Sequence, residues 1–261
     1  IDDLTVTIND TPSCAISSAT TTEITCQLDP LPAGNYSVRA FVNSIGEASG
    51  SPLFITIPLE VDSIAPTFGA LGGGTTLTIA GSGFPDGSTQ NNNLVVSVTI
   101  NGADCLITSI STGSITCVTP AQPSGAYAVV VDYNGQTAQN GNFNYSQAST
   151  GTVTAINATS IISPAMNNVA VLIDGSAFGS TKGSVNLTKS ARCDIMLWED
   201  TQIVCILPRL PAGSYGLTIE IPGNGFADAS AIAPIEYDFS ITSMSPTVGS
   251  LLGCLLYTSD A

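Results

Sequence analysis

Short runs of alternating apolar and polar residues recur along the chain, and they predict β-strands. The clearest are YSVRAFV from Tyr36, YAVVVDY from Tyr127, YGLTIEI from Tyr215, and the segment from Val95 to Ile100. Two of these runs end in Asn101-Gly102 and Asn134-Gly135, which are strong hairpin signals. No segment of ten or more residues shows helical periodicity, so the pattern predicts an all-β fold.

Six of the seven cysteines form three pairs with identical spacing. Within each pair the cysteines are twelve positions apart, and the first members lie 91 and then 88 residues apart. The pairs are Cys14 with Cys26, Cys105 with Cys117, and Cys193 with Cys205. A period of about 90 residues is the size of a small β-sandwich, so we expect tandem repeats.

The repeat extends beyond the cysteines to three further positions. Counting from the second cysteine, a proline follows at six positions, a glycine at eight and a tyrosine at ten. These residues are Pro32, Pro123 and Pro211, then Gly34, Gly125 and Gly213, then Tyr36, Tyr127 and Tyr215. The proline presets a turn, the glycine permits a positive φ, and the tyrosine resembles a tyrosine corner.

The cysteine pairs are interpreted as disulfides between antiparallel neighbouring strands, whose Cα atoms lie within disulfide reach. Buried free thiols and a metal site are the alternatives, although zinc sites usually show two to four residues between cysteines. Disulfides imply an oxidising compartment. We therefore expect the protein to be extracellular or at the cell surface.

The repeat register also predicts the domain organisation. Residues 1–58 form a partial repeat that lacks its opening strands, because only 13 residues precede Cys14. Residues 59–148 form a complete repeat, residues 149–240 form the next, and residues 241–253 begin a further one. Residues 254–261 resemble translated vector sequence, so the unpaired Cys254 needs no functional explanation.

One motif set resembles the IPT/TIG domain, an immunoglobulin-like domain of plexins, fibrocystin-like surface proteins and some transcription factors. In the middle repeat it consists of Ser63-Ile64-Ala65-Pro66, Gly69, Gly72 to Gly74, Gly81-Ser82-Gly83-Phe84, Asn101-Gly102, Cys105, Cys117, Pro120, Gly125 and Tyr127. The third repeat keeps much of it, and the first keeps only the back half. The resemblance implies tandem immunoglobulin-like β-sandwiches in an elongated array, either extracellular or DNA-binding, and the acidic charge favours the former.

Charge and composition exclude several functions. The chain has 5 basic residues, 20 acidic residues, no histidine and a net charge of -15. Catalysis or metal binding by histidine is excluded, and five basic residues cannot form a phosphate-binding stripe. No apolar run reaches the roughly 18 residues that a membrane span needs. We expect no enzymatic activity, no cofactor, no nucleic acid partner and no membrane contact within this segment.

Five Asn-x-Ser/Thr sequons are candidate sites for N-linked glycans: Asn9, Asn35, Asn144, Asn157 and Asn186. The alternative is that a chain rich in Ser, Thr and Asn produces such triplets by chance. Calcium binding at Asp62, at Asp86 or at Glu236 with Asp238 is a weaker hypothesis, since these acids lack a calcium-site spacing. Glu199-Asp200 does not stand out as a catalytic carboxylate pair. Trp198 is expected to pack in a core or between repeats, with a ligand contact as the alternative.

The leading functional hypothesis is a structural or adhesive rod-like segment of a cell-surface or secreted glycoprotein. Its partners would be other repeats or further copies of the chain. In a fibre, residues 241–248 of one copy would complete the first repeat of the next copy. The alternative is that the sequence is a fragment of a longer array, which also explains the incomplete first repeat and the extra opening strand. The alternative hypotheses are a receptor ectodomain that binds a protein or glycan, and the accessory module of a carbohydrate-active enzyme. A receptor would bind through the third repeat, which holds Lys182, Lys189, Arg192 and Arg209.

Overall fold

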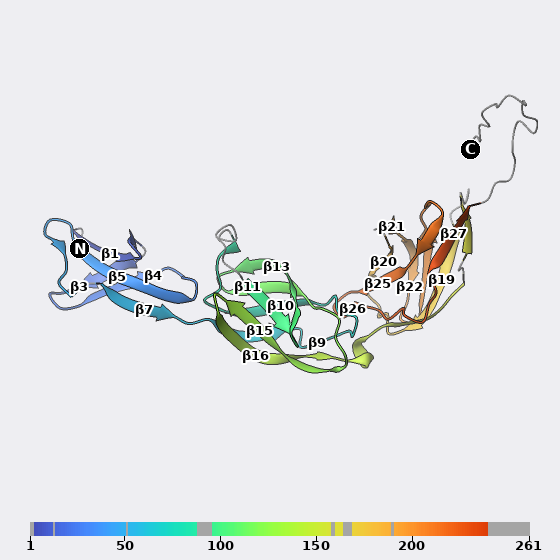
Figure 1. The fold of residues 1–261 in the computed structure, drawn as a ribbon, viewed down its shortest axis with the longest axis horizontal. Helices are drawn as coiled ribbons and strands as arrows, with labels where there is room; N and C mark the ends of the chain where they lie inside the picture. Colours follow the sequence, from blue (N-terminus) through green and yellow to red (C-terminus); the bar gives the residue numbers. More distant parts are fainter. Residues whose placement is uncertain are drawn as a thin grey trace, which may run out of the picture. The chain divides into compact units, whose positions relative to one another are not determined.

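The computed structural model consists of β-strands joined by short turns, and the strands of each repeat gather into their own group of sheets (Figure 1). The structure describes residues 3–12, 14–50, 52–87, 96–157, 160–163, 169–188 and 191–239. Residues 241–253, Cys254 and the rest of the C-terminal segment lie outside the described residues, as does Lys189. The predicted all-β fold of immunoglobulin-like sandwiches is confirmed.

The second repeat is a sandwich of two antiparallel sheets with one parallel addition. One sheet has the order β13-β14-β10-β8, and the other has the order β12-β11-β15-β16-β9, in which β9 pairs with β16 in parallel. Its strands are β8 (Glu60–Ala65), β9 (Phe68–Gly69), β10 (Thr76–Ser82), β11 (Val96–Ile100), β12 (Ala103–Asp104), β13 (Leu106–Ser111), β14 (Ser114–Val118), β15 (Gly125–Tyr133) and β16 (Gln136–Tyr145). A 3-10 turn, Gln147–Ser149, follows β16.

The third repeat has similar strand pairing, but its strands form three sheets instead of two. Its sheets have the orders β17-β19-β23-β22, β21-β20-β25-β26 and β18-β27-β24, and β18 pairs with β27 in parallel. The strands are β17 (Thr152–Ile156), β18 (Ser160–Ser163), β19 (Val169–Ser176), β20 (Ser184–Leu187), β21 (Ala191–Arg192), β22 (Asp194–Trp198), β23 (Gln202–Leu207), β24 (Gly213–Tyr215), β25 (Leu217–Ile221), β26 (Gly225–Phe226) and β27 (Ile235–Phe239).

The first repeat has fewer strands in one of its sheets. One sheet has the order β2-β1-β5-β6 with β7 also on β5, and the other contains only β3 and β4. The strands are β1 (Leu4–Ile8), β2 (Thr11–Pro12), β3 (Cys14–Ala19), β4 (Ile24–Leu28), β5 (Gly34–Val42), β6 (Gly46–Glu47) and β7 (Leu53–Ile57). Among the described residues, no strand pairs with the second edge of β4.

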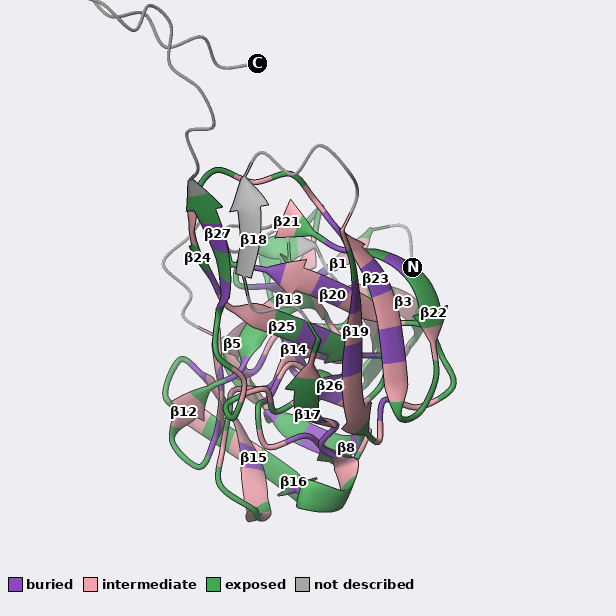
Figure 2. Cartoon of the chain, turned by 90° about the vertical axis from the view of Figure 1, so that its right-hand side faces the viewer, coloured by how far each residue is buried: buried purple, intermediate pink, exposed green. Residues whose placement is uncertain are grey.

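Alternation along the strands places one face of each sheet in a core. Along β23 every second residue is buried, and the residues between them are only partly buried. Figure 2 shows similar bands on β19. In the second repeat the core includes Leu77, Ile79, Phe84 and Ile115, each 0% exposed. Burial of such aliphatic and aromatic side chains contributes about 1.5–3 kcal/mol each. The period of two in the sequence therefore corresponds to a core-facing side and a solvent-facing side.

The Asn-Gly hairpins form as predicted. Asn101 and Gly102 have φ of 52° and 76°, and Asn134 and Gly135 have φ of 53° and 81°. Two positive φ angles in a two-residue loop define the turn that matches the right-handed twist of hairpin strands. Asn9 and Asp10, with φ of 46° and 66°, form a similar turn between β1 and β2 that the sequence analysis missed.

The chain divides into two compact units. One consists of residues 1–150 with Pro222–Phe226, and the other consists of residues 151–221 with 227–261. Within the first unit the first and second repeats are in contact, since the Ala33 amide donates to the Gly83 carbonyl at 2.7 Å. Gly83 has φ +77°, and a Cβ there would lie 2.4 Å from the Pro58 carbonyl oxygen. Only glycine fits this contact without strain.

Candidate functional site

The three cysteine pairs occupy equivalent places in the repeats. Cys14 begins β3, Cys105 and Cys193 directly precede β13 and β22, and their partners lie on β4, β14 and β23. The Cα–Cα distances are 5.5 Å for Cys14–Cys26, 5.6 Å for Cys105–Cys117 and 5.7 Å for Cys193–Cys205. The paired cysteines are diagonal neighbours, because the residue opposite Cys26 is Ile16 and not Cys14. The last two disulfides are buried, whereas Cys14 and Cys26 are only partly buried.

Each cysteine hairpin also has a bulge at an equivalent position. The bulged residues are Ser17, Thr108 and Met196, each without a partner in the Cα register. The Ser17 hydroxyl donates to the Thr25 carbonyl, and the Thr108 hydroxyl donates to the Thr116 carbonyl, both at 3.1 Å. Met196 has no hydroxyl, and its side chain is 65% exposed. The third repeat therefore departs from the other two on this strand.

The tyrosines ten positions after the second cysteine form tyrosine corners in two repeats. The Tyr36 hydroxyl donates to the Pro32 carbonyl at 2.7 Å, and the Tyr215 hydroxyl donates to the Pro211 carbonyl at 3.0 Å. In the second repeat Tyr127 packs against Tyr145 with ring centroids 6.0 Å apart.

The glycines before these tyrosines differ in backbone conformation. A glycine permits a positive φ, and of the three only Gly213 has one, at +154°. At Gly125 the reason is space, because a Cβ would lie 2.9 Å from the ring carbon and oxygen of Tyr127. At Gly34 the nearest atom of Tyr36 would lie at 3.4 Å. At Gly125 the ring of Tyr127 folds back over the glycine and leaves no room for a Cβ, whereas 3.4 Å at Gly34 would be an ordinary van der Waals contact.

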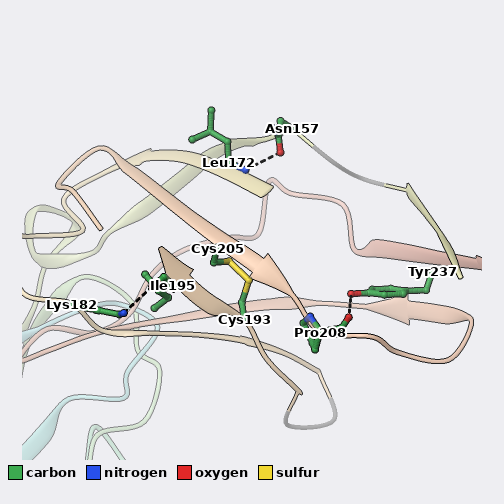
Figure 3. Close-up of a disulfide and its surroundings, with 8 residues drawn as sticks. All are labelled: Asn157, Leu172, Lys182, Cys193, Ile195, Cys205, Pro208 and Tyr237. Carbon is green, nitrogen blue, oxygen red and sulfur yellow. Dashed lines mark hydrogen bonds between the residues drawn. A yellow bond between two sulfur atoms is a disulfide. The ribbon is translucent and has the colours of Figure 1, made fainter. Parts of the chain in front are cut away.

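Four of the five sequon asparagines are exposed: Asn9, Asn35, Asn144 and Asn157. Oδ1 of Asn9 accepts from the Ser37 amide at 2.9 Å, and Oδ1 of Asn157 accepts from the Leu172 amide at 2.8 Å (Figure 3). N-glycosylation modifies Nδ2 and leaves Oδ1 as an acceptor. These hydrogen bonds are therefore compatible with a glycan.

Asn186 differs from the other sequon asparagines. It lies on β20, its side chain is only partly exposed, and its Nδ2 donates to the Ser184 hydroxyl at 3.1 Å. The nitrogen that would carry a glycan is thus the atom engaged in the hydrogen bond.

A surface hollow of about 230 Å³ lies in the third repeat beside the Cys193–Cys205 disulfide. We call it the cationic hollow, and it is lined by Lys182, Arg192, Cys193, Asp194 and Ile195. Lys182 Nζ donates to the Ile195 carbonyl at 2.9 Å, as Figure 3 shows, so its ammonium group is held at the hollow. Lys182 and Arg192 were expected in a ligand face of the third repeat, but no spacing in the sequence signals that the fold brings them together.

The basic residues have different surroundings in the two units. In the first repeat Arg39 lies 3.6 Å from an Asp10 oxygen and 3.9 Å from a Glu47 oxygen. In the described part of the chain, neither Lys182 nor Arg192 forms an ion pair. Their charge is therefore available to a ligand.

The other candidate residues do not gather into a site. Within the described residues, no group of three or more carboxylate or thiol side chains lies where it could hold a metal ion. Asp62 and Asp86 lie in the second repeat and Glu199-Asp200 in the third. Trp198 has the structural role that was expected: Nε1 donates to the carbonyls of Phe178 at 3.2 Å and Gly179 at 3.1 Å.

No helix that is long and apolar enough to cross a bilayer occurs in the described part of the chain. The family model described as "IPT/TIG domain" matches residues 1–56, 59–145 and 152–237.

Similar curated proteins are much longer than this chain. Homo sapiens fibrocystin-L is 28% identical over 248 residues, which cover 92% of this chain and 6% of that protein. Mus musculus fibrocystin-L is 32% identical over 231 residues, or 88% of this chain and 5% of that protein. Cyclomaltodextrin glucanotransferase of Niallia circulans is 31% identical over 62% of this chain and 23% of that enzyme. Among solved structures, the plexin A4 extracellular region aligns with a TM-score of 0.45 and 16% identity, covering 96% of this chain and 24% of that one.

Proposed function

Because the chain belongs to the IPT/TIG domain family, we propose that it is an extracellular structural or adhesive segment of a longer cell-surface or secreted glycoprotein. In this proposal the segment acts through its shape and surface. It has no catalytic activity of its own, since a chain with no histidine lacks the commonest general base.

The observation that carries the proposal is the placement of a disulfide at one equivalent position in every repeat. Disulfides persist in oxidising compartments and are reduced in the cytosol of most organisms. The length of the fibrocystin-L relatives, of which this chain spans 6% or less, supports a segment within a larger protein.

Counting thiols tests the proposed compartment. The chain is expressed with a secretion leader and denatured without reductant, and its free thiols are titrated. Before reduction we expect one reactive thiol, that of Cys254, and after reduction we expect all seven. Six or seven free thiols in the unreduced secreted protein would refute the extracellular proposal.

Adhesion to another repeat is the finer part of the proposal, and β4 is the strand that supports it. In the second repeat β10 pairs with β14, and Cys117 and Ile115 on β14 are 0% exposed in the core of the repeat. The corresponding Ile24 on β4 is 36% exposed. An added strand would cover this apolar position and satisfy the backbone groups of the edge.

Sheet order limits which strand can be added. The partner of β14 is β10, so β4 needs a β10-type strand. By sequence, residues 241–249 match residues 61–69, which include the outer strand β8. Head-to-tail addition of residues 241–248 to β4 would therefore put a β8-type strand in the position of β10. The sheet order thus favours a β10-type strand over residues 241–248 as the partner of β4.

Mass photometry of the purified chain tests self-association. Growth of dimers and longer multimers with concentration would support a fibre. A single monomer peak at every concentration would refute fibre formation by this segment, while leaving the extracellular proposal intact.

A second candidate function is a carbohydrate-binding accessory module. It is favoured by the match to cyclomaltodextrin glucanotransferase over 62% of the chain. The open reading frame of the intact protein tests it, because this candidate requires a catalytic domain in the same polypeptide.

A further inference from the structure

We infer that the cationic hollow of the third repeat binds an anionic sugar, meaning a sugar ring that carries a carboxylate or a sulfate. This inference goes beyond the structural role proposed above. It rests on the geometry of five residues within one repeat, Lys182 and Arg192 to Ile195.

Two cationic side chains can bind the anionic group. The Lys182 ammonium has three donor hydrogens, and the bond to the Ile195 carbonyl uses one of them. Arg192 has no ion pair with any described residue, so its planar guanidinium can donate two parallel hydrogen bonds to a carboxylate or sulfate. The 2.9 Å hydrogen bond from Lys182 Nζ to the Ile195 carbonyl oxygen holds the ammonium group in place before a ligand binds.

The remaining lining residues suit the sugar ring. Asp194 is exposed and is not paired with Lys182 or Arg192, so its carboxylate can accept hydrogen bonds from ring hydroxyls. Cys193 and Ile195 are 1% and 7% exposed and form an apolar base. Small-molecule sites combine an apolar lining with a few polar groups that fix orientation. A sugar ring presents both kinds of surface.

The charged residues of the hollow are specific to the third repeat. The residues on either side of the first cysteine are Arg192 and Asp194 there, Asp104 and Leu106 in the second repeat, and Ser13 and Ala15 in the first. Leu106 is 70% exposed and cannot replace the carboxylate. The shared fold therefore does not require these charges, which favours a ligand-binding role.

Size and net charge favour a small ligand over an acidic protein partner. Pockets for small molecules measure roughly 300–1,000 Å³, so the hollow, at about 230 Å³, has room for a small ligand or for part of one. The chain has a net charge of -15, so a large acidic partner would meet repulsion from most of its surface.

The test is a titration of the isotope-labelled chain followed by nuclear magnetic resonance. The probes are glucuronic acid, glucose 6-sulfate, neutral glucose, sodium sulfate and a short glutamate peptide. We expect the amides of residues 192–195 to shift with one or both anionic sugars, with a dissociation constant on the order of millimolar. The two sugar acids distinguish a carboxylate ligand from a sulfate ligand.

Variants at Arg192 test the assignment of the site. Arg192→Gln is expected to weaken binding of the anionic sugar at least ~10-fold, and Arg192→Lys is expected to weaken it less, because lysine keeps the charge but loses the fork. Arg209→Gln removes a positive charge from the same repeat at a residue that does not line the hollow, and it is expected to leave binding unchanged. The Trp198 indole signal reports whether each variant is folded, since that N–H donates inside the repeat.

Several results would overturn the inference. They are equal binding of glucose and glucuronic acid, equal binding of sodium sulfate alone, shifts with the glutamate peptide but not with sugars, and unchanged affinity in Arg192→Gln. Each would leave the disulfide-based proposal untouched, because that proposal is tested by thiol counting.

Discussion

At the scale of single residues, disulfide burial predicts which cysteine matters most for stability. Cys117 is 0% exposed, so Cys117→Ser removes the cross-link and also buries a hydroxyl group. We expect a loss of about 2–4 kcal/mol for the cross-link and more for the hydroxyl. Hydrogen exchange resolved by peptide, across β13 and β14, measures the loss.

Cys26→Ser provides the matched control. The closed loop has the same length, with a sequence separation of 12 in both disulfides, but Cys26 is only partly buried. The serine hydroxyl can then reach water, and the first repeat should lose less stability than the second repeat loses in Cys117→Ser. Equal losses would contradict the role assigned to burial.

Tyr145 predicts a loss of stability in alkaline solution. Burial raises the pKa of this tyrosine from 10.0 to about 12, and its side chain is 0% exposed. The folded state therefore holds the proton more tightly than the unfolded state. The associated stability is present in full below pH 10 and is lost as the pH rises to about 12. The loss is about 2–3 kcal/mol.

Urea denaturation of the wild-type chain and of Tyr145→Phe, at several pH values from 9 to 12, measures this effect. Tyr36, Tyr133 and Tyr237 also have pKa values raised by burial, so both proteins should lose stability in this range. The prediction concerns the difference between them: Tyr145→Phe should lose less. Parallel curves for the two proteins would show that Tyr145 does not ionise at the expected pH.

Sequence reasoning reached the hairpins because their determinants are local. The cysteine spacing and the Asn-Gly dipeptides act within one turn, so Cys105–Cys117 and the turn at Asn101 could be predicted. The reason for Gly125 could not, because it depends on how the ring of Tyr127 folds back over it. The cationic hollow likewise requires the loop before β20 to meet the start of β22, and no sequence spacing encodes that contact.

At the scale of secondary-structure elements, the edge of β4 on which no described strand pairs predicts binding of a β10-type peptide. In the second repeat Leu77 lies opposite Cys117 and Ile79 lies opposite Ile115. A peptide of residues 74–83 should therefore place its Leu77 and Ile79 side chains over Cys26 and Ile24. We expect slower amide hydrogen exchange along Ile24–Leu28 when the peptide is in excess.

A control peptide with aspartate at the positions of Leu77 and Ile79 keeps the backbone donors and acceptors but loses the apolar side chains. It should give little protection. Equal protection by both peptides, or protection by neither, would show that β4 does not accept a strand in the register of β10.

At the scale of the whole molecule, the chain must stay soluble with charged residues making up only 10% of its sequence. N-linked glycans on exposed sequons would supply the missing hydration. The structure ranks the sequons: the side chains of Asn9, Asn35, Asn144 and Asn157 are exposed, whereas Asn186 donates through Nδ2 on a strand. We expect the four exposed sites to be occupied after secretion from mammalian cells, and Asn186 to be occupied least.

Glycopeptide mass spectrometry of the secreted chain measures occupancy at each site, and single Asn→Gln variants assign the glycans independently. Removal of the glycans by an amidase should then lower solubility, because the amidase restores a bare surface and adds only one carboxylate at each site. A variant with glutamine at all four exposed sites serves as the matched control and should behave like the deglycosylated protein. If that variant is secreted and remains as soluble as the glycosylated chain, the net charge of -15 is sufficient for solubility without glycans.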